Sequence, residues 1–178
     1  MLDRVREATF SILGRRVAGA RVLDLYAGSG SLGLEALSRG AALARMIERD
    51  PKAVAVLREN VEALGLRDRA QVVRGDALRE DLWRPLLTED AYDVVFLDPP
   101  YRDVEEPAAR AIVLARATDL LRRAIRPGGI LVLHVPSRAL ESLRFDGTPA
   151  SSGEFVRDER RYGSSGVLLV RREEGSSA

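Results

Sequence analysis

The chain has 178 residues, of which 46% are hydrophobic and 31% charged, and a net charge of +1; these values exclude a disordered or fibrous protein. It contains no cysteine, which excludes disulfides and thiolate metal sites, and we expect no metal site of any kind. No apolar run reaches the roughly 18 residues of a membrane-spanning helix, so we expect a cytoplasmic protein without membrane contact.

Apolar strands alternate with helices along the first half of the chain. We expect an opening helix and lead-in over residues 1–20. The expected strands are Arg21–Tyr26, Ala42–Glu48 and Ala70–Arg74, and the first helix is Ser31–Arg39, closed by Gly40. A second helix is expected between Asp50, an N-cap followed by Pro51, and Gly65, which stops it. Its apolar face consists of Val54, Leu57, Val61 and Leu64.

The second half continues this alternation and ends differently. A weaker helical stretch includes Trp83, which we expect to pack in the core, and Tyr92–Leu97 is typical of a strand buried on both faces. A long helix before Pro127-Gly128-Gly129 is expected to carry Leu114, Thr118, Leu121 and Ile125 at helical spacing. The last expected elements are a strand at Ile130–Val135, a hairpin of Glu154–Tyr162 and Val167–Arg172 around Gly163-Ser164-Ser165-Gly166, and a frayed tail at Glu173–Ala178.

This order of elements predicts the fold class. Strands alternating with helices imply right-handed crossovers and parallel pairing. We therefore expect an α/β fold, with a doubly wound, mostly parallel, Rossmann-like sheet and a C-terminal antiparallel hairpin, in one domain over residues 1–178. His134, alone on the fifth strand, is interpreted as structural rather than as a ligand or base. The hairpin arginines predict a basic patch made of Arg157, Arg160, Arg161, Arg171 and Arg172.

A glycine-rich loop follows the first strand and opens the first helix. Gly28, Gly30 and Gly33 match the pattern G-x-G-x-x-G, and Glu48 lies at the end of the second strand. Glycines allow a tight turn and let a ligand approach bare backbone, while the helix N-terminus offers free N–H groups. An acid in the position of Glu48 can bind ribose hydroxyls. The glycines alone therefore do not choose between NAD and S-adenosylmethionine.

Asp24, inside the end of the first strand, favours S-adenosylmethionine. That ligand carries an ammonium group and a sulfonium, which a carboxylate attracts, whereas a carboxylate would repel the pyrophosphate of a dinucleotide. The alternative is that Asp24 only ties down the loop. Asp76, in Gly75-Asp76-Ala77 after the third strand, either binds the adenine amine or is a helix N-cap. The sequence does not favour one of these roles over the other.

A second motif, Asp98-Pro99-Pro100-Tyr101, directly follows the buried fourth strand. The exocyclic amine of a base is a poor nucleophile, because its lone pair is delocalised into the ring. Asp98 and the Pro99 carbonyl can accept its two N–H hydrogens, which stabilises the charge that develops on the nitrogen and orients its lone pair. Prolines stiffen the loop and lack a competing N–H. Tyr101 can stack on an extruded or single-stranded base.

The alternative for this tetrapeptide is a simple strand-ending turn, because Asp-Pro and Pro-Pro are common breakers. Topology argues against it. In a doubly wound sheet, strands one and four flank the point where strand order reverses, and ligands bind at their carboxyl ends. The glycine loop and the tetrapeptide are therefore predicted neighbours at one crevice.

Four segments carry a family resemblance, namely Asp3-Arg4-Val5-Arg6-Glu7, Ala27-Gly28-Ser29-Gly30, Gly33-Leu34-Glu35-Ala36-Leu37-Ser38-Arg39-Gly40 and Asp98-Pro99-Pro100-Tyr101. With them the chain resembles, over nearly its whole length, the bacterial methyltransferases that modify guanine N2 in 16S ribosomal RNA. The tetrapeptide is shared by many amino-methyltransferases, including DNA adenine enzymes. The opening segment and the helix segment are more particular to the ribosomal family.

The resemblance implies S-adenosylmethionine as cofactor, 16S ribosomal RNA or a small-subunit assembly intermediate as partner, and a monomer. The opening helix would close over the methionine end, with Arg6 either pairing with the carboxylate or lying solvated. The expected catalytic residues are Asp98, Pro99, Pro100 and Tyr101. The expected cofactor-binding residues are Asp24, Tyr26, Ala27, Gly28, Ser29, Gly30, Glu48, Asp76, Ala77 and Arg6.

One departure from the family concerns the start of the chain. Family members carry a basic N-terminal segment with a small hairpin before Asp-Arg-Val-Arg-Glu, whereas this chain begins at Met1-Leu2-Asp3. We therefore expect an RNA-gripping element to be absent. Three alternatives stay open: a DNA adenine-N6 or other amino-methyltransferase, a nicotinamide-dependent oxidoreductase, and an RNA-binding assembly factor without turnover.

Overall fold

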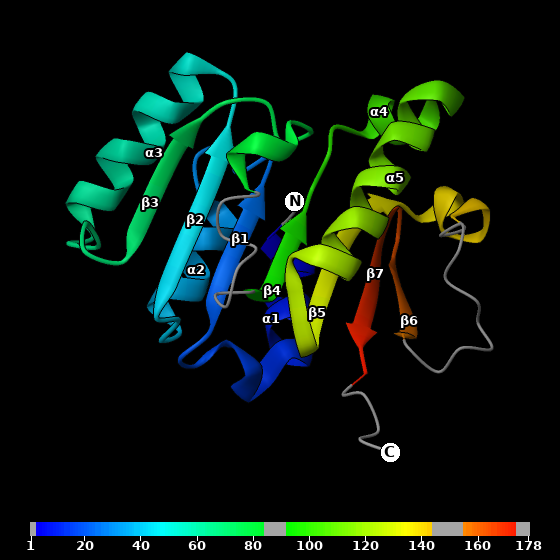
Figure 1. Cartoon of the computed structure of the whole chain (residues 1–178), viewed down its shortest axis with the longest axis horizontal. Coiled ribbons are helices and arrows are strands. Elements are labelled where there is room, and N and C mark those ends of the chain that lie inside the picture. Colours follow the sequence, from blue (N-terminus) through cyan, green and yellow to red (C-terminus); the bar gives the residue numbers. More distant parts are fainter. Residues whose placement is uncertain (1–2, 84–91, 144–154, 174–178) are drawn as a thin grey trace.

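The computed structural model describes residues 3–83, 92–143 and 155–173 of the chain. Its centre is a seven-stranded sheet with the order β3-β2-β1-β4-β5-β7-β6 (Figure 1). The strands are β1 (Arg21–Leu25), β2 (Leu43–Glu48), β3 (Ala70–Arg74), β4 (Tyr92–Leu97), β5 (Ile125–Pro136), β6 (Phe155–Tyr162) and β7 (Ser165–Arg172). Strands β1 to β5 pair in parallel, and β7 pairs antiparallel with both β5 and β6. The predicted doubly wound, mostly parallel sheet with a terminal antiparallel hairpin is confirmed.

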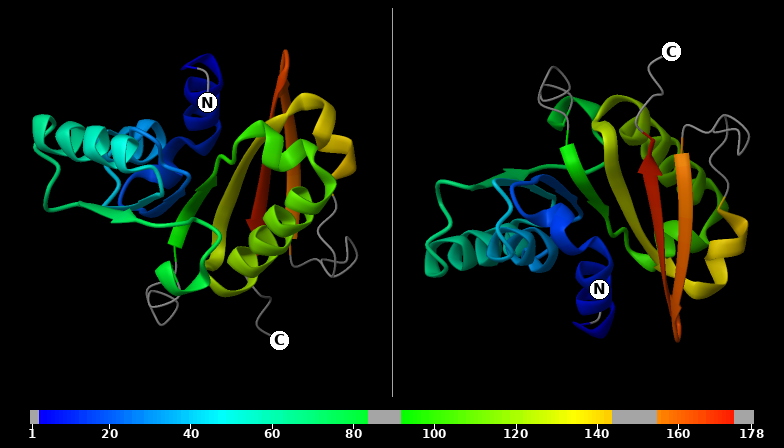
Figure 2. Two further views of the ribbon diagram at one scale, coloured as in Figure 1. Left: turned by 90° about the horizontal axis from the view of Figure 1, so that it is seen from above. Right: turned by 90° about the horizontal axis from the view of Figure 1, so that it is seen from below.

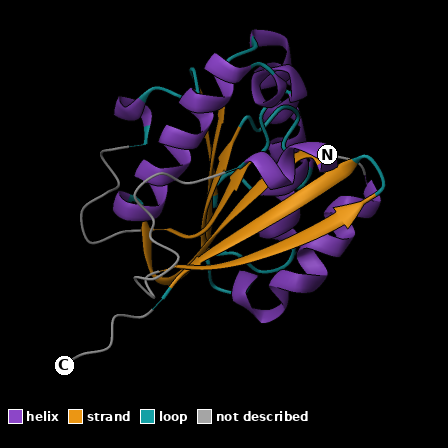
Figure 3. Cartoon of the chain, turned by 90° about the vertical axis from the view of Figure 1, so that its right-hand side faces the viewer, coloured by secondary structure: helices purple, strands orange, loops and turns teal. Residues whose placement is uncertain are grey.

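Helices cover both faces of this sheet. They are α1 (Asp3–Leu13), α2 (Ser31–Ser38), α3 (Pro51–Ala63), α4 (Tyr101–Glu105) and α5 (Pro107–Arg123), with 3₁₀ turns at Gly14–Val17, Glu80–Leu82 and Ser137–Ser142. Figure 2 shows α1, α2 and α3 on one face and α4 and α5 on the other, and Figure 3 shows the twisted sheet between them. In the described segments, no helix is long and apolar enough to cross a bilayer.

The two faces have separate apolar cores because successive strand residues point to opposite sides. Val22, Phe96 and Val132 belong to the core under α1, α2 and α3, whereas Leu97 and Leu133 belong to the core under α5. Phe10 of α1 packs on Phe96 of β4, with ring centroids 5.6 Å apart. Trp83 is fully buried, as predicted. This alternation also decides which side chains can reach the crevice at the carboxyl ends of the strands.

The sequence signals for α3 are confirmed, with one correction. The Asp50 carboxylate accepts hydrogen bonds from the backbone amides of Lys52 (2.7 Å) and Ala53 (3.0 Å), as an N-cap does. Gly65 follows the helix in the left-handed conformation, with φ of +65°. The prediction that Leu64 lies on the buried face is wrong, because the helix ends at Ala63 and the Leu64 side chain is 55% exposed.

A second correction concerns Ile125, which we expected on the long helix. Helix α5 ends at Arg123, and Ile125 begins β5 by pairing with Tyr92. The register then shifts, so that Val94 pairs with Ile130. A Cβ on Gly129 would lie 2.7 Å from Cγ2 of Ile125 and 3.0 Å from the Tyr92 carbonyl oxygen. Strand β5 therefore contains the Pro-Gly-Gly segment, across which its register with β4 shifts, instead of starting after it.

The remaining differences lie in short segments. The stretch before Trp83 contains a single 3₁₀ turn at Glu80–Leu82 instead of a helix. The hairpin turns at Gly163 and Ser164, so that Ser165 and Gly166 belong to β7. Helix α4, directly after the two prolines, was not expected. Glu154 and residues 174–178 of the expected tail lie outside the described residues.

Candidate active site

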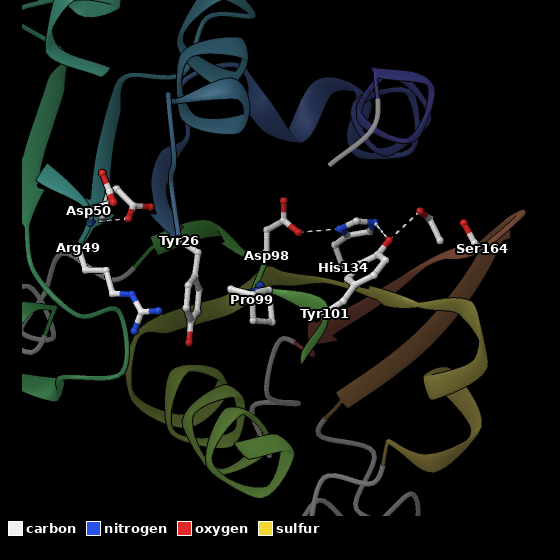
Figure 4. A pocket seen from close by; sticks show the side chains of 11 residues that line it. Tyr26, Arg49, Asp50, Asp98, Pro99, Tyr101, His134 and Ser164 are labelled. Atoms are coloured by element: carbon white, nitrogen blue, oxygen red, sulfur yellow. Dashed lines mark hydrogen bonds and ion pairs between the residues drawn. The ribbon is translucent and has the colours of Figure 1, made fainter. Parts of the chain in front are cut away.

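A cleft of about 790 Å³ lies at the carboxyl ends of the parallel strands, where the strand order reverses between β1 and β4 (Figure 4). Its walls come from the segments that follow β1, β2, β4 and β6, together with one residue each from β2, β5 and β7. The residues lining it are Tyr26, Glu48, Arg49, Asp50, Asp98, Pro99, Pro100, Tyr101, His134, Ser164 and Ser165. The structure therefore joins the whole predicted tetrapeptide with Tyr26 and Glu48 of the predicted cofactor set, at the place that the topology indicated.

Strand alternation and register place Asp98 beside His134. Leu97 of β4 pairs with Leu133 of β5, so the next residue on each strand, Asp98 and His134, lies on the opposite face from that pair. That face is the one covered by α1 and α2. Asp24 of β1, which pairs with Phe96, lies on the same face. Polar side chains from three neighbouring strands therefore converge on one side of the sheet.

Four side chains form a continuous hydrogen-bonded chain in the cleft, and Figure 4 shows three of them in a row. His134 Nδ1 lies 2.6 Å from Asp98 Oδ1, and His134 Nε2 lies 3.3 Å from the Tyr101 hydroxyl. That hydroxyl lies 2.9 Å from Ser165 Oγ on β7. His134 and Ser165 are buried, whereas Tyr101 is 37% exposed. The ring of Tyr101 is thus held at its hydroxyl end and open to the cleft.

The environment of Asp98 favours its charged form. Burial raises the pKa of the Asp98 carboxyl, whereas the hydrogen bond to His134 and nearby positive charge lower it. The hydrogen bond and the positive charge together outweigh burial, so the pKa of Asp98 lies below its ordinary value. The Asp98 carboxylate is therefore acceptor-only over the physiological range, which is the state that our interpretation of the tetrapeptide requires.

The two prolines have different roles. Pro99 is buried, and Pro100 stands at the N-cap position of α4 with Tyr101 as its first helical residue. The Pro100 carbonyl accepts a hydrogen bond from the Asp103 amide (2.9 Å). The Pro99 carbonyl is therefore the better candidate for receiving a hydrogen from a ligand.

The glycine loop is tied to the end of β2 through Glu48. The Gly28 amide donates to Glu48 Oε2 (2.9 Å), and the Asp50 amide donates to Glu48 Oε1 (2.8 Å). An ionised carboxylate has about four acceptor positions, so both oxygens can still accept from ligand hydroxyls. Tyr26 has φ of +67°, which is unusual for a bulky residue and costs on the order of 1–3 kcal/mol. This backbone conformation turns the chain sharply from β1 into the loop.

Asp24 lies beneath the loop rather than on the cleft wall. Its Oδ2 accepts a hydrogen bond from the Gly33 amide (2.8 Å), which ties α2 to β1 as the alternative interpretation predicted. Its Oδ1 is buried and has no hydrogen-bond partner among the described residues. Burial, with smaller contributions from the charges of Asp98 and Glu48, raises the pKa of Asp24 to about 7. A cationic ligand would relieve this concentration of negative charge, so the site fits the ammonium and sulfonium groups of S-adenosylmethionine.

The other predicted cofactor residues lie around this centre. Asp76 accepts a hydrogen bond from the Leu78 amide (2.9 Å) in a turn, and Ala77 is buried. The alternative that Asp76 is a helix N-cap is wrong, because no helix begins there. The Ser29 carbonyl accepts from Asn60 Nδ2 (3.0 Å). Arg6 of α1 forms an ion pair with Asp3 (3.0 Å). None of these four predicted residues lines the described cleft.

Sequence reasoning missed five of the residues that line the cleft, which are Arg49, Asp50, His134, Ser164 and Ser165. Asp50 was recognised only as a helix cap, and His134 only as a structural residue. A signal for His134 was present. It is the polar residue in an apolar strand, at the position that corresponds to Asp98 on the neighbouring strand. Ser164 and Ser165 reach the site only through the terminal hairpin, whose pairing with β5 the sequence does not specify.

Comparison with known proteins gives consistent matches over most of the chain. A family model described as "Conserved hypothetical protein 95" matches residues 1–147. The protein named "Putative rRNA methyltransferase YlbH" of Bacillus subtilis (strain 168) is 34% identical over 171 residues, covering 96% of this chain and 85% of that protein.

Two further proteins have related names. "Ribosomal RNA small subunit methyltransferase D" of Escherichia coli (strain K12) is 41% identical over 102 residues, which cover 56% of this chain and 48% of that protein. This match therefore spans about half of the relative. A solved structure described as "Putative methyltransferase yhhF from Escherichia coli" superposes with a TM-score of 0.72 at 29% identity, covering 97% of this chain and 87% of that one.

Proposed function

The chain belongs to the conserved hypothetical protein 95 family, and from this premise we propose that it methylates the N2 amine of a guanine in 16S ribosomal RNA, with S-adenosylmethionine as methyl donor. One observation carries the proposal. The partly buried Asp98 and the exposed ring of Tyr101 share a cleft with Glu48, and the unpartnered oxygen of Asp24 lies on the same side of the sheet as Asp98. Names of the relatives support a ribosomal RNA substrate.

The donor half of the site is built from β1, β2 and the glycine loop. S-adenosylmethionine, when bound, supplies an electrophilic methyl group on a positively charged sulfur. Asp24 holds positive charge with the carboxylate oxygen that Gly33 leaves unused. Glu48 accepts hydrogen bonds from ribose hydroxyls while it keeps the Gly28 amide in place. These residues bind and orient the donor and take no part in removing the proton from the amine.

The acceptor half is built from the tetrapeptide. Asp98 Oδ2 and the Pro99 carbonyl accept the two hydrogens of the base amine, so that its lone pair points away from both oxygens. Tyr101 stacks on the base and fixes its plane. The nitrogen gains a methyl group and loses one proton, and Asp98 Oδ2, already in contact with that hydrogen, receives it before it passes to solvent. Stabilising the positive charge that builds up on the amine is the largest contribution of Asp98.

The charges of the cleft argue against the nicotinamide alternative. A dinucleotide pyrophosphate would face Asp24, Glu48 and Asp98; the charges of the last two add to the burial that raises the pKa of Asp24. A nucleic-acid amine with a cationic methyl donor meets no such repulsion. DNA adenine-N6 methylation uses the same chemistry, and the names of the matched relatives favour ribosomal RNA over it.

The proposal is tested with labelled S-adenosylmethionine and small ribosomal subunits, or 16S transcripts, from cells that lack the gene. We expect incorporation of one methyl group, which mass spectrometry of the nucleosides identifies as N2-methylguanine. Asp98→Ala should lower kcat by roughly 100-fold or more, because it removes the group that stabilises the developing charge. The folded wild-type protein failing to methylate any of these substrates, or methylating adenine instead, would overturn the assignment.

A matched control is available on β4, the strand that leads into Asp98. Asp93 is a buried carboxylate at the other end of this strand, where its Oδ2 accepts from the Arg21 amide (2.6 Å). Asp93→Asn should reduce stability and leave the rate per folded molecule unchanged. The comparison separates loss of the chemical group at Asp98 from general damage to β4.

A further inference from the structure

His134 is the one histidine among the 178 residues, and it lies inside the candidate active site. Its side chain is 4% exposed, and its two ring nitrogens face two members of the predicted catalytic set. We propose that His134 is a positioning residue that fixes the orientation of the Asp98 carboxylate through Nδ1 and of the Tyr101 ring through Nε2. The proposal rests on the proposed function, because it assigns a role within that reaction.

The position of the ring follows from the sheet. The pairing of Leu97 with Leu133 sets Asp98 and His134 side by side on the face of α1 and α2. On the other side of His134, β7 continues the sheet, with Val167 as the paired residue. Strand β5 therefore lies between β4 and β7, and rotation of the ring would break its contacts with Asp98 and Tyr101. A side chain held this firmly can fix the orientation of neighbouring side chains that would otherwise rotate.

The hydrogen-bond donors can be assigned from the acceptor-only character of Asp98. An ionised carboxylate has no hydrogen to give, so the 2.6 Å contact requires a hydrogen on Nδ1 of His134. When the ring carries a hydrogen on Nδ1 alone, Nε2 is an acceptor, and the Tyr101 hydroxyl donates to it over 3.3 Å. Ser165 Oγ donates in turn to the Tyr101 oxygen over 2.9 Å. The chain thus has one direction, from Ser165 to Asp98.

This arrangement has a consequence for each of the two neighbours. Because Oδ1 of Asp98 is engaged by the ring, the proposal assigns Oδ2 to the substrate amine. The hydrogen bond from His134 also helps to keep Asp98 ionised despite its burial. Tyr101, 37% exposed, is held at its hydroxyl by His134 and Ser165, with its ring tilted at 52° to the imidazole. Its exposed face is therefore presented in one orientation.

Nuclear magnetic resonance tests the hydrogen assignment directly. Because the chain contains a single histidine, a long-range ¹H–¹⁵N spectrum of the ring needs no assignment by mutation. We expect two well-separated nitrogen resonances, with the hydrogen on Nδ1 and slow exchange of that hydrogen with water. Asp98→Ala should shift the Nδ1 resonance. A hydrogen on Nε2 alone, or a freely exchanging ring, would overturn the proposal whatever the enzyme methylates.

Two substitutions separate the two contacts. The amide nitrogen of Asn stands near the position of Nδ1, and that of Gln stands near Nε2. We expect His134→Asn to raise KM for RNA and to lower kcat less than His134→Gln does, because it keeps a donor to Asp98 but loses the contact with Tyr101. His134→Gln should lower kcat by roughly 10- to 100-fold, because Asp98 loses its donor, with a smaller effect on KM.

Stability and donor binding are the control measurements for these two variants. Melting temperature and the affinity for S-adenosylmethionine should be similar in the two variants, because neither touches the glycine loop. Equal loss of kcat in both variants, in proportion to lost stability, would show a purely structural role and overturn the proposal. Absence of methyl transfer by the wild-type protein would instead contradict the proposed function, and the ring spectrum would still decide the role of His134 as a positioning residue.

Discussion

Asp24 has the least favourable environment of the charged groups around the cleft. It is buried, one of its oxygens has no hydrogen-bond partner among the described residues, and Asp98 and Glu48 repel its negative charge. Burial is the main reason that its pKa rises to about 7. A bound cation reverses the balance and favours the carboxylate. Binding of a cationic donor is therefore expected to release a proton near neutral pH.

This linkage predicts how donor affinity depends on pH. The dissociation constant for S-adenosylmethionine should be nearly constant above pH 7, and should rise by up to about tenfold for each pH unit below it. Isothermal titration calorimetry in buffers of different ionisation enthalpy measures both the affinity and the released proton. Asp24→Asn should bind more weakly and show a flat profile. An unchanged pH slope in this variant would contradict the role of Asp24.

The raised pKa of Asp24 also predicts that the stability of the donor-free protein falls as the pH rises, whereas donor affinity increases. Its folded pKa, about 7, exceeds the unfolded value of 3.8, so the folded state holds the proton more tightly. The resulting stabilisation is complete below about pH 4 and is lost as the pH rises through 7, an effect on the order of a few kcal/mol. Without donor, Asp24→Asn should melt at a higher temperature than the wild type at pH 8. The two proteins should converge at pH 4, and a wild type that stays the more stable at pH 8 would refute this.

At the scale of elements, the site depends on the close packing of α2 against β2. A Cβ on Gly33 would lie 2.5 Å from Sδ of Met46 and 3.2 Å from Oδ2 of Asp24. Met46 is fully buried, so it has little room to move away. The missing side chain of Gly33 is therefore what allows its amide to reach Asp24. The third glycine of the loop motif acts here through packing.

Gly33→Ala is therefore expected to destabilise the fold, although Ala favours helix by about 1 kcal/mol over Gly. The overlap with Met46 should outweigh that gain and leave a net loss of about 1–3 kcal/mol in the free energy of unfolding, measured by urea denaturation. The affinity for S-adenosylmethionine should fall as well, because Asp24 is displaced. Combining it with Met46→Ala should cost less than the sum of the two single changes. Simple additivity would show that the overlap is not the cause.

Signals in neighbouring residues predicted most helices and strands, whereas the sequence predicted fewer of the contacts between these elements. Asp50 and Pro51 located the start of α3, and a largely apolar run located β4, because the signals for capping and burial lie in neighbouring residues. Ile125 was misplaced, because its helical spacing continued past the real end of α5 and only the pairing with Tyr92 decides against it. Residues that pair across the sheet were the weakest part of the prediction.

The candidate site shows the same division. Asp98 and Tyr101 were found because their motif is contiguous, and the order of strands placed them beside the glycine loop. His134 was interpreted as structural, because its relation to Asp98 depends on the register between β4 and β5. Ser165 joins the site through an antiparallel strand about 30 residues further along the chain. Long-range register is set by the packing of the whole sheet and is not encoded in a local pattern.

At the scale of the whole molecule, charge pairing changes the interpretation of the basic hairpin. Arg160 pairs with Asp158 (2.8 Å), Arg161 with Glu141 (2.9 Å) and Arg171 with Glu173 (2.7 Å), while Arg157 pairs with Glu159. Arg172 donates to the carbonyl oxygens of Arg122 and Ile125. The expected basic patch is therefore largely neutralised by the protein itself, in agreement with a net charge of only +1.

RNA binding should accordingly depend little on the outer hairpin arginines. Exposed ion pairs are weak, so these pairs can open, but the neighbouring carboxylates would still repel a phosphate. The double change Arg160→Ala and Arg161→Ala should leave the slope of log K against log salt unchanged. Two real phosphate contacts on single-stranded RNA would each contribute about 0.7 to that slope, so a decrease of more than 1 would contradict this expectation.

The matched experiment removes the acids instead of the arginines. Asp158→Asn with Glu141→Gln frees the guanidinium groups of Arg160 and Arg161, which are about half exposed, without changing their positions on the hairpin. This variant should bind RNA more tightly at low salt and show a steeper salt dependence, while methyl transfer to the specific site gains nothing. Filter binding across a salt series measures the first effect and labelled methyl incorporation the second. An unchanged salt slope would mean that the hairpin points away from bound RNA, and that substrate selection depends on the cleft itself.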